Sequence, residues 1–261
     1  RATDLQRLYG EEFQLRGHHF EVQPRSAYLA RSGMEAYGLR LLHRHPERGP
    51  IDAFLKIFRL DVPKRRERTE FLMNYAHQAR NRALQGIPYA YFDGVQINGV
   101  QVVGHLARFA APSATAQASD FAELKDNWDA FGARDRRALA LSLASTVATL
   151  EEAGITHGDI NPRNLIVSRL HAQEAACYLC DYDGFTHSQT VQLPRQYGNQ
   201  PARPLGSEGF QYPSLLERMK RDANNVDDGV FVETDRFALA VTTCELLAWR
   251  NTTTEQLLRG H

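Results

Sequence analysis

One segment near the middle of the chain constrains the fold more than any other feature. It covers residues 155–167 and runs ITHGDINPRNLIV. Apolar residues at helical spacing precede it and an apolar, strand-like run closes it, so its polar residues belong on a loop. Asp159 and Asn164 lie on that loop, and Asp181 directly follows the next short apolar run, ACYLC.

These residue types suit one kind of chemistry. An Asp on a loop can accept or orient the proton of an attacking hydroxyl group, and the side-chain oxygen of an Asn can bind Mg²⁺. A strand that delivers Asp181 to its end lets a carboxylate bridge Mg²⁺ and the phosphates of a nucleotide. The pattern favours phosphoryl transfer, with Asp159 as the catalytic residue and Asn164 and Asp181 as metal ligands.

The order H-x-D-x-x-x-x-N, then a strand, then D-[FY]-[GD], resembles that of protein kinases. It is most similar to divergent bacterial members of the eukaryotic-like kinase superfamily, which often carry H-G-D, as His157, Gly158 and Asp159 do here. The resemblance covers nearly the whole chain, roughly residues 17–247. It implies that His157 is a packing and hydrogen-bonding residue and not the base.

The resemblance also implies the architecture. We expect an α+β, protein-kinase-like bilobal fold. Residues 1–108 form an N-terminal lobe of antiparallel sheet plus one long helix, and residues 109–261 form a mainly helical C-terminal lobe. Three further motifs place nucleotide-binding and structural residues in these two lobes.

The first motif concerns the nucleotide phosphates. Lys56, in AFLKI, matches the strand lysine that contacts the α- and β-phosphates in the family, although an exposed strand lysine is the alternative. Gly33, Tyr37 and Gly38, in GMEAYGLR, fit the loop that covers the phosphates, although one glycine of that pattern is missing. An ordinary hairpin turn is the alternative for this stretch.

The second motif is a helix glutamate that holds Lys56. A long helix is expected between Pro63 and Gly86, and both Glu67 and Glu70 lie on it, off its apolar side. We favour Glu70, because its greater distance along the chain from Lys56 leaves more room for the connecting loop. A solvent-facing glutamate is the alternative for either residue.

The third motif lies downstream. The stretch GSEGFQYPS resembles G-T-P-x-Y-x-A-P-E, the end of an activation segment, in which Gly206, Ser207 and Pro213 fit. The stretch DRFALA resembles the start of the central helix, and the resemblance implies that Asp235 accepts hydrogen bonds from the catalytic-loop backbone. A helix N-cap is a second interpretation of Asp235, and the two roles are compatible. These two motifs favour a protein substrate.

Several residues depart from the family pattern. Gly158 replaces an arginine that receives an activation-loop phosphate in many kinases, and Asn161 replaces a lysine that neutralises the transferred group. Arg163 can supply that charge instead. Asp183 replaces the glycine of D-F-G and is either a turn residue, which we favour, or a second metal ligand.

Periodicity predicts the elements around these motifs. Strands are expected at residues 19–22, 27–30, 38–42, 53–58 and 100–103, and a loop at 110–119. A second helix is marked by Leu139, Leu143, Val147 and Leu150 and ends at Gly154. A third begins at Asp235.

Composition excludes some functional classes. Lys+Arg and Asp+Glu both number 31, so no net field favours nucleic acid, and no apolar run is long enough to span a membrane. Three cysteines fit the cytoplasm and no disulfide framework, and we interpret Cys177 and Cys180 as core residues rather than a zinc or redox pair. We interpret His43 and His45 as part of a solvated polar turn, with a metal site as the alternative.

The expected function is phosphoryl transfer from ATP, with Mg²⁺ or Mn²⁺, to a Ser or Thr hydroxyl of a protein substrate. Lys56 holds the α- and β-phosphates, Asp159 orients the hydroxyl, and Arg163 screens the γ-phosphoryl charge. The alternatives are a pseudokinase scaffold and a small-molecule kinase acting on a sugar or antibiotic. Fusion to, or association with, other domains is also compatible with the sequence.

Overall fold

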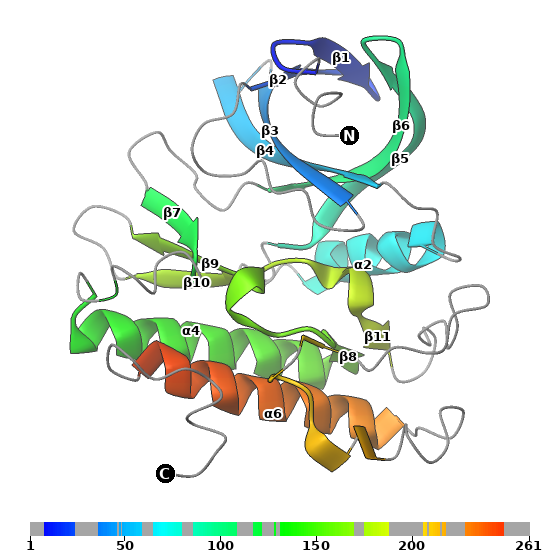
Figure 1. Cartoon of the computed structure of the whole chain (residues 1–261). Coiled ribbons are helices and arrows are strands. Elements are labelled where there is room, and N and C mark those ends of the chain that lie inside the picture. Colours follow the sequence, from blue (N-terminus) through cyan, green and yellow to red (C-terminus); the bar gives the residue numbers. More distant parts are fainter. Residues whose placement is uncertain are drawn as a thin grey trace. The chain divides into compact units, whose positions relative to one another are not determined.

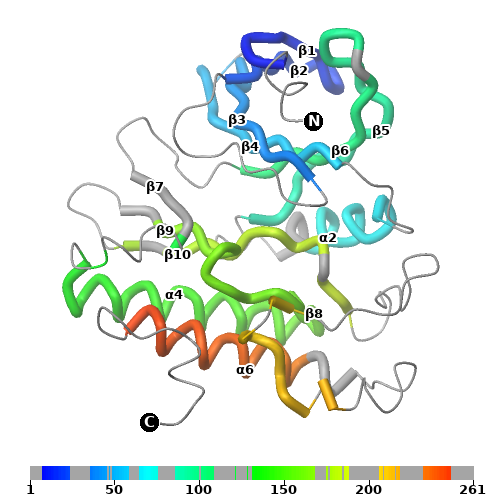
Figure 2. Tube along the Cα trace, viewed as in Figure 1, coloured from blue at the N-terminus to red at the C-terminus, as the bar shows by residue number. Residues whose placement is uncertain are grey.

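The computed structural model describes residues 8–23, 36–45, 47, 49–58, 65–79, 86–108, 117–121, 128, 131–169, 175–187, 206–207, 209–214, 216–217 and 228–247. Figure 2 traces the backbone along the chain and draws residues of uncertain placement in grey. The chain divides into two compact units, one containing the described residues up to 108 and the other those from 117 onward. The first is rich in strands and the described part of the chain contains three α-helices, which confirms the α+β class.

The first unit is built on one antiparallel sheet, in the order β1-β2-β3-β4-β6-β5. Figure 1 shows that this sheet is strongly curled. Its strands are β1 (Glu12–Leu15), β2 (His18–Val22), β3 (Ala36–His45), β4 (Gly49–Phe58), β5 (Pro88–Ile97) and β6 (Val100–Arg108). The predicted strands at 19–22, 38–42, 53–58 and 100–103 are confirmed, whereas β1 and β5 were not predicted.

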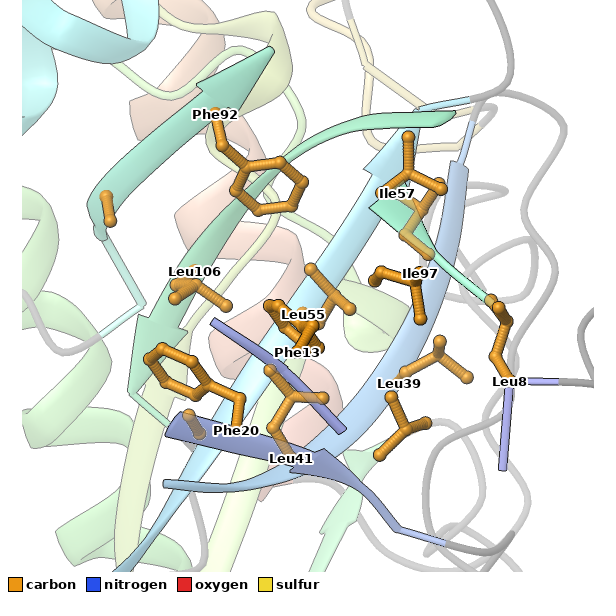
Figure 3. Packing of buried hydrophobic residues seen from close by; sticks show 14 residues of the cluster. Leu8, Phe13, Phe20, Leu39, Leu41, Leu55, Ile57, Phe92, Ile97 and Leu106 are labelled. Carbon is orange, nitrogen blue, oxygen red and sulfur yellow. The ribbon is translucent and has the colours of Figure 1, made fainter. Parts of the chain in front are cut away.

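The core of this unit fills the concave face of the sheet. Along β4, Ala53, Leu55 and Ile57 are buried while the residues between them are partly exposed, as expected for a strand with one covered face. Figure 3 shows Leu55 and Ile57 among apolar side chains of the other strands. Lys56 therefore lies on the opposite face of the sheet from the core, and Gly38 is its direct partner across the β3–β4 pair.

Helix α2 (Arg65–Ala79) packs on β5 and confirms the described part of the predicted long helix. Its covered side is unexpectedly polar, because Arg65, Arg68 and Thr69 are buried along with Leu72. The guanidinium group of Arg65 lies 3.9 Å from the ring centroid of Phe58 in β4, a cation–π contact that lets a charged residue be covered.

The second unit contains two long helices, α4 (Ala133–Glu152) and α6 (Asp228–Leu247). The predicted apolar positions of α4 are all buried, and they comprise Leu139, Leu143, Val147 and Leu150. Helix α4 packs against α6 and against the strand β10 (Ala176–Leu179). Within the described part of the chain, neither these helices nor α2 combines the length and the apolar character that a membrane span requires.

Short elements carry the polar loops of this unit. Strand β8 (Ile155–Thr156) pairs with β11 (Thr186–His187), and β9 (Leu165–Arg169) pairs with β10 and with β7 (Gln117–Asp120). Two single-turn 3₁₀ helices, η3 (Pro162–Asn164) and η4 (Tyr182–Gly184), lie within the two predicted site loops. The loops that carry the polar residues are thus held at both ends by strands or 3₁₀ helices.

Five predictions of local structure need correction or lie outside the described residues. Helix α6 begins at Asp228, so Asp235 lies inside the helix and is not its N-cap. Strand β3 extends to His45, so His43 and His45 lie on a strand and not in a turn. The end of the predicted loop at 110–119 belongs to β7. The predicted strand at 27–30 and Gly33 fall outside the described residues.

Candidate functional site

The carboxylate of Asp159 is surrounded by hydrogen-bond donors. Its Oδ1 accepts hydrogen bonds from Asn161 Nδ2 and from the hydroxyl group of Ser207, each at 2.9 Å. Its Oδ2 accepts one from Asn164 Nδ2, also at 2.9 Å. The carboxylate is therefore fixed in one orientation by three side chains, and the residue is still partly exposed.

Asn161 shapes the loop beneath this carboxylate. Its side-chain oxygen accepts a hydrogen bond from the backbone N–H of Arg163 at 2.9 Å and caps η3. Its amide nitrogen reaches both Asp159 Oδ1 and the Ser207 hydroxyl. Asn161 is buried, so its side chain bonds within the loop and organises it. Arg163 is exposed, so its side chain faces solvent.

Asp235 supports the same loop from α6. Its carboxylate accepts hydrogen bonds from the backbone N–H groups of His157 at 2.6 Å and of Gly158 at 2.9 Å. Burial raises the pKa of Asp235 to about 7, and the two backbone hydrogen bonds oppose this shift because they favour the charged form. A buried carboxyl group on a helix thus satisfies two successive backbone donors of the loop.

His157 joins the two site loops. Its Nε2 donates to the backbone carbonyl of Cys180 at 3.0 Å, and its Nδ1 accepts from the backbone N–H of Asp159 at 3.2 Å. Burial lowers the pKa of His157, which favours the neutral ring that this pair of bonds requires. The ring also meets the edge of Tyr182, with centroids 4.7 Å apart.

Cys180 fixes the start of the segment that carries Asp181. Its backbone N–H donates to the carbonyl of Asn164 at 2.9 Å, so the two predicted metal-binding residues are held through adjacent backbone groups. Asp181 is exposed. Its backbone adopts the left-handed conformation, with φ of 66°, which is uncommon for residues other than glycine and turns the chain sharply after β10. Neither Cys177 nor Cys180 forms a disulfide; Cys177 is buried as predicted, whereas Cys180 is partly exposed.

Ser207 was matched to the family motif but not predicted as a site residue. The segment carrying it approaches the loop closely, because a Cβ on Gly206 would come within 3.3 Å of the carbonyl oxygen of Gly158. Gly206 also has φ of +87°, and its carbonyl accepts a hydrogen bond from Gln211 Nε2 at 2.7 Å. The signal that could have identified Ser207 is its place beside Gly206 in GSEGFQYPS.

The predicted nucleotide-binding residues belong to the first unit. Gly38 faces the same side of the sheet as Lys56, whereas Tyr37 packs against the core. Glu70 forms an ion pair with Arg66 one turn earlier in α2, at 2.9 Å, and Glu67 is exposed. The pairing of Glu70 with Lys56 and the phosphate-binding roles of Lys56, Tyr37 and Gly38 stay predictions.

Comparison with known proteins supplies independent information on the second unit. Residues 113–195 match the lipopolysaccharide kinase (Kdo/WaaP) family, which belongs to the protein-kinase-like superfamily. The matching stretch is less than half of the chain, but it contains Asp159, Asn164 and Asp181. None of the curated proteins matches the chain. The family similarity supports an ATP-dependent phosphoryl transfer, and it does not support a protein substrate.

A kinase-type match implies ATP and, typically, a divalent metal. The oxygen-bearing side chains of Asn164 and Asp181 are of the type that binds such a metal. The side-chain nitrogen of Asn164 donates to the backbone carbonyl and to Oδ2 of Asp159, and an amide oxygen such as its Oδ1 is a ligand type that Mg²⁺ accepts. Within the described residues, no three His, Cys, Asp or Glu side chains form a metal-binding group. Mg²⁺ is commonly held by one or two protein oxygens together with phosphates and water, so Asn164 and Asp181 suffice.

Proposed function

We propose that this protein is a kinase that transfers the γ-phosphoryl group of ATP to a hydroxyl group of a sugar, of the kind found in lipopolysaccharide. The observation that carries the proposal is the orientation of the Asp159 carboxylate by three donors. Asp159 and two of these donors, Asn161 and Asn164, lie within the stretch that matches the lipopolysaccharide kinase family. A carboxylate placed in this way can accept the proton of an attacking hydroxyl.

The other residues act through binding and orientation. Lys56, with Glu70, holds the α- and β-phosphates, and the strand-rich unit acts as the nucleotide lobe of a bilobal, kinase-like fold with lobes at 1–108 and 109–261. Asn164 and Asp181 hold the metal, which when bound neutralises phosphate charge. Arg163 extends into solvent and screens the transferred group. We place this activity in the cytoplasm, where ATP is available.

The contact between Ser207 and Asp159 shows that this carboxylate can accept a hydrogen bond from a hydroxyl group. The Ser207 hydroxyl donates to Asp159 Oδ1 at 2.9 Å, which is the interaction that an acceptor hydroxyl needs before transfer. This geometry does not distinguish a sugar from a protein, and the family match favours the sugar. The presence of Asp159, Asn164 and Asp181 together argues against a pseudokinase.

The proposal is tested by phosphate transfer from γ-labelled ATP, with Mg²⁺ or Mn²⁺, to two acceptors presented in parallel. One is lipopolysaccharide core oligosaccharide and the other is a generic protein substrate. We expect label in the oligosaccharide. We also expect Asp159→Asn to lower kcat by about 10²- to 10⁴-fold, the usual range for loss of a general base. ATP affinity, measured by calorimetry, should change little.

A matched control is Glu152→Gln, an exposed carboxylate at the end of α4 in the same unit, which should leave kcat unchanged. Undiminished transfer by Asp159→Asn would show that the assigned role is wrong. Label in the protein substrate alone would reject the sugar acceptor. ATP binding without transfer to either acceptor would favour the pseudokinase.

A further inference from the structure

Three histidines lie together at one end of the core face of the first unit. On β3, Leu41, His43 and His45 alternate on one face, and on β2 the same face carries Phe20 and His18. Leu41 and Phe20 are almost completely buried, so the apolar interior of the sheet ends in three imidazole rings. We call His18, His43 and His45 the imidazole cluster.

The rings of the imidazole cluster are close enough to share a ligand. His43 Nε2 lies 3.1 Å from His18 Nδ1. The ring centroids are 4.9 Å apart for His18 and His43, 5.5 Å for His43 and His45, and 6.3 Å for His18 and His45. Two of the residues are on one strand and the third is on its hydrogen-bonded neighbour, so the sheet itself fixes their spacing.

Two of the three ring separations match the requirements of a metal bound by imidazole. With Zn–N distances of about 2.0–2.1 Å, tetrahedral ligand nitrogens lie roughly 3.3 Å apart and the ring centroids roughly 5.2 Å apart. The His18–His43 pair already satisfies both values closely, and the His43–His45 centroids do so too. We propose that His18, His43 and His45 form a binding site for a divalent transition metal such as Zn²⁺.

One side chain must move to complete the site. His45 Nδ1 accepts a hydrogen bond from the backbone N–H of Glu47 at 3.2 Å, so the metal is bound through its Nε2. The 6.3 Å between the His18 and His45 centroids shows that the His45 ring must turn toward the other two. Among the described residues, no preformed metal-binding group of His, Cys, Asp or Glu is present. Because the three backbone positions lie on one hydrogen-bonded strand pair, the proposal requires a change of the His45 side-chain rotamer and no movement of the strands.

The chemistry of the cluster decides which ion it takes. Imidazole nitrogen suits Zn²⁺, Cu²⁺ and Ni²⁺, whereas Mg²⁺ prefers oxygen ligands, so this site differs in selectivity from the one formed by Asn164 and Asp181. Three protein ligands leave a further position for water. A metal here would cross-link β2 and β3 at the open end of the core and thereby stabilise the first unit.

The test is a calorimetric titration of the whole chain with Zn²⁺ in excess Mg²⁺, which occupies oxygen sites. We expect stoichiometric binding that weakens at least tenfold in His43→Gln and in His45→Gln. The matched control is His19→Gln. His19 is adjacent to His18 on β2 but faces the other side of the sheet, where it contacts Gln14. This control should bind Zn²⁺ as the unaltered protein does.

A second measurement reports the ligands directly. Co²⁺ in the same site should give the visible absorption of a tetrahedral, nitrogen-ligated ion, and this absorption should disappear in His43→Gln while circular dichroism shows a folded protein. Absence of stoichiometric Zn²⁺ binding would overturn the proposal. So would equal affinity in the unaltered protein, His43→Gln and His45→Gln, or an equal loss in His19→Gln.

Discussion

The two units of the molecule organise their polar residues in opposite ways. In the second unit, hydrogen bonds between distant parts of the chain fix the site: Asp235 reaches His157 across 78 positions and Ser207 reaches Asp159 across 48. In the first unit, the register of neighbouring strands places Lys56 opposite Gly38. The second unit therefore depends on hydrogen bonds that satisfy buried polar groups, and the first unit depends on the close approach of neighbouring backbones.

This difference predicts two kinds of failure. Removal of an acceptor in the second unit leaves buried N–H groups without a partner, whereas a slightly larger side chain in the first unit forces strands apart. A substitution in each unit therefore tests the comparison, and a substitution within the Asp159 network tests it more finely.

The largest effect is expected from Asp235→Ala. It leaves the backbone N–H groups of His157 and Gly158 without their acceptor in a buried position. We expect a loss of about 2–5 kcal/mol in the free energy of unfolding, measured by urea denaturation, since each orphaned donor costs about 1–3 kcal/mol.

The control for this substitution is Glu233→Ala, an exposed residue in the same helix, which should change stability by less than about 0.5 kcal/mol. If Asp235→Ala were as stable as this control, the loop would not depend on α6, and the contrast between the units would lose its basis.

A smaller effect is expected from Gly104→Ala in the first unit. A Cβ at this position would lie 2.1 Å from the backbone oxygen of Lys56 and 3.0 Å from Cζ of Phe92. The backbone cannot move aside as a flexible side chain can, so we expect a loss of about 1–3 kcal/mol in the free energy of unfolding. Displacement of the strand that carries Lys56 should also weaken ATP binding.

Gln101→Ala, an exposed change on the same strand, separates this effect from general loss of strand propensity. We expect it to leave stability and ATP binding close to their original values. Weaker ATP binding in Gln101→Ala than in Gly104→Ala would indicate that the close approach to Lys56 does not set the position of that residue.

In the second unit, sequence patterns predicted elements with one apolar face better than they predicted where a helix begins. Leu139, Leu143, Val147 and Leu150 recur at helical spacing, and all are buried in α4. The start of α6 could not be located in this way, because the helix runs through Asp235, whose buried carboxyl group is satisfied by a loop far away in sequence. The local periodicity of a sequence contains no information on hydrogen-bond partners that are distant along the chain.

The same limit explains the errors in the first unit. His43 and His45 resemble a polar turn in the sequence, yet they continue the core face of β3, where Phe20 stacks on His43 with ring centroids 4.6 Å apart. Arg65 and Arg68 interrupt the apolar stripe of α2 although both are buried. Polar residues that are covered by aromatic or backbone groups cannot be distinguished from exposed ones by residue type alone.

The smallest effect is expected from Ser207→Ala. This change removes one of three donors to Asp159, while Asn161 and Asn164 keep the other two. We expect kcat to fall by about tenfold, equivalent to about 1.4 kcal/mol, with the KM for ATP unchanged, because Ser207 positions Asp159 and does not bind nucleotide. Ser207→Thr keeps the hydroxyl group and should restore kcat, and Ser214→Ala, at an exposed position nearby, should have no effect. If Ser207→Ala had full activity, two donors would be enough to orient the carboxylate, and the network of the second unit would tolerate loss at its edge.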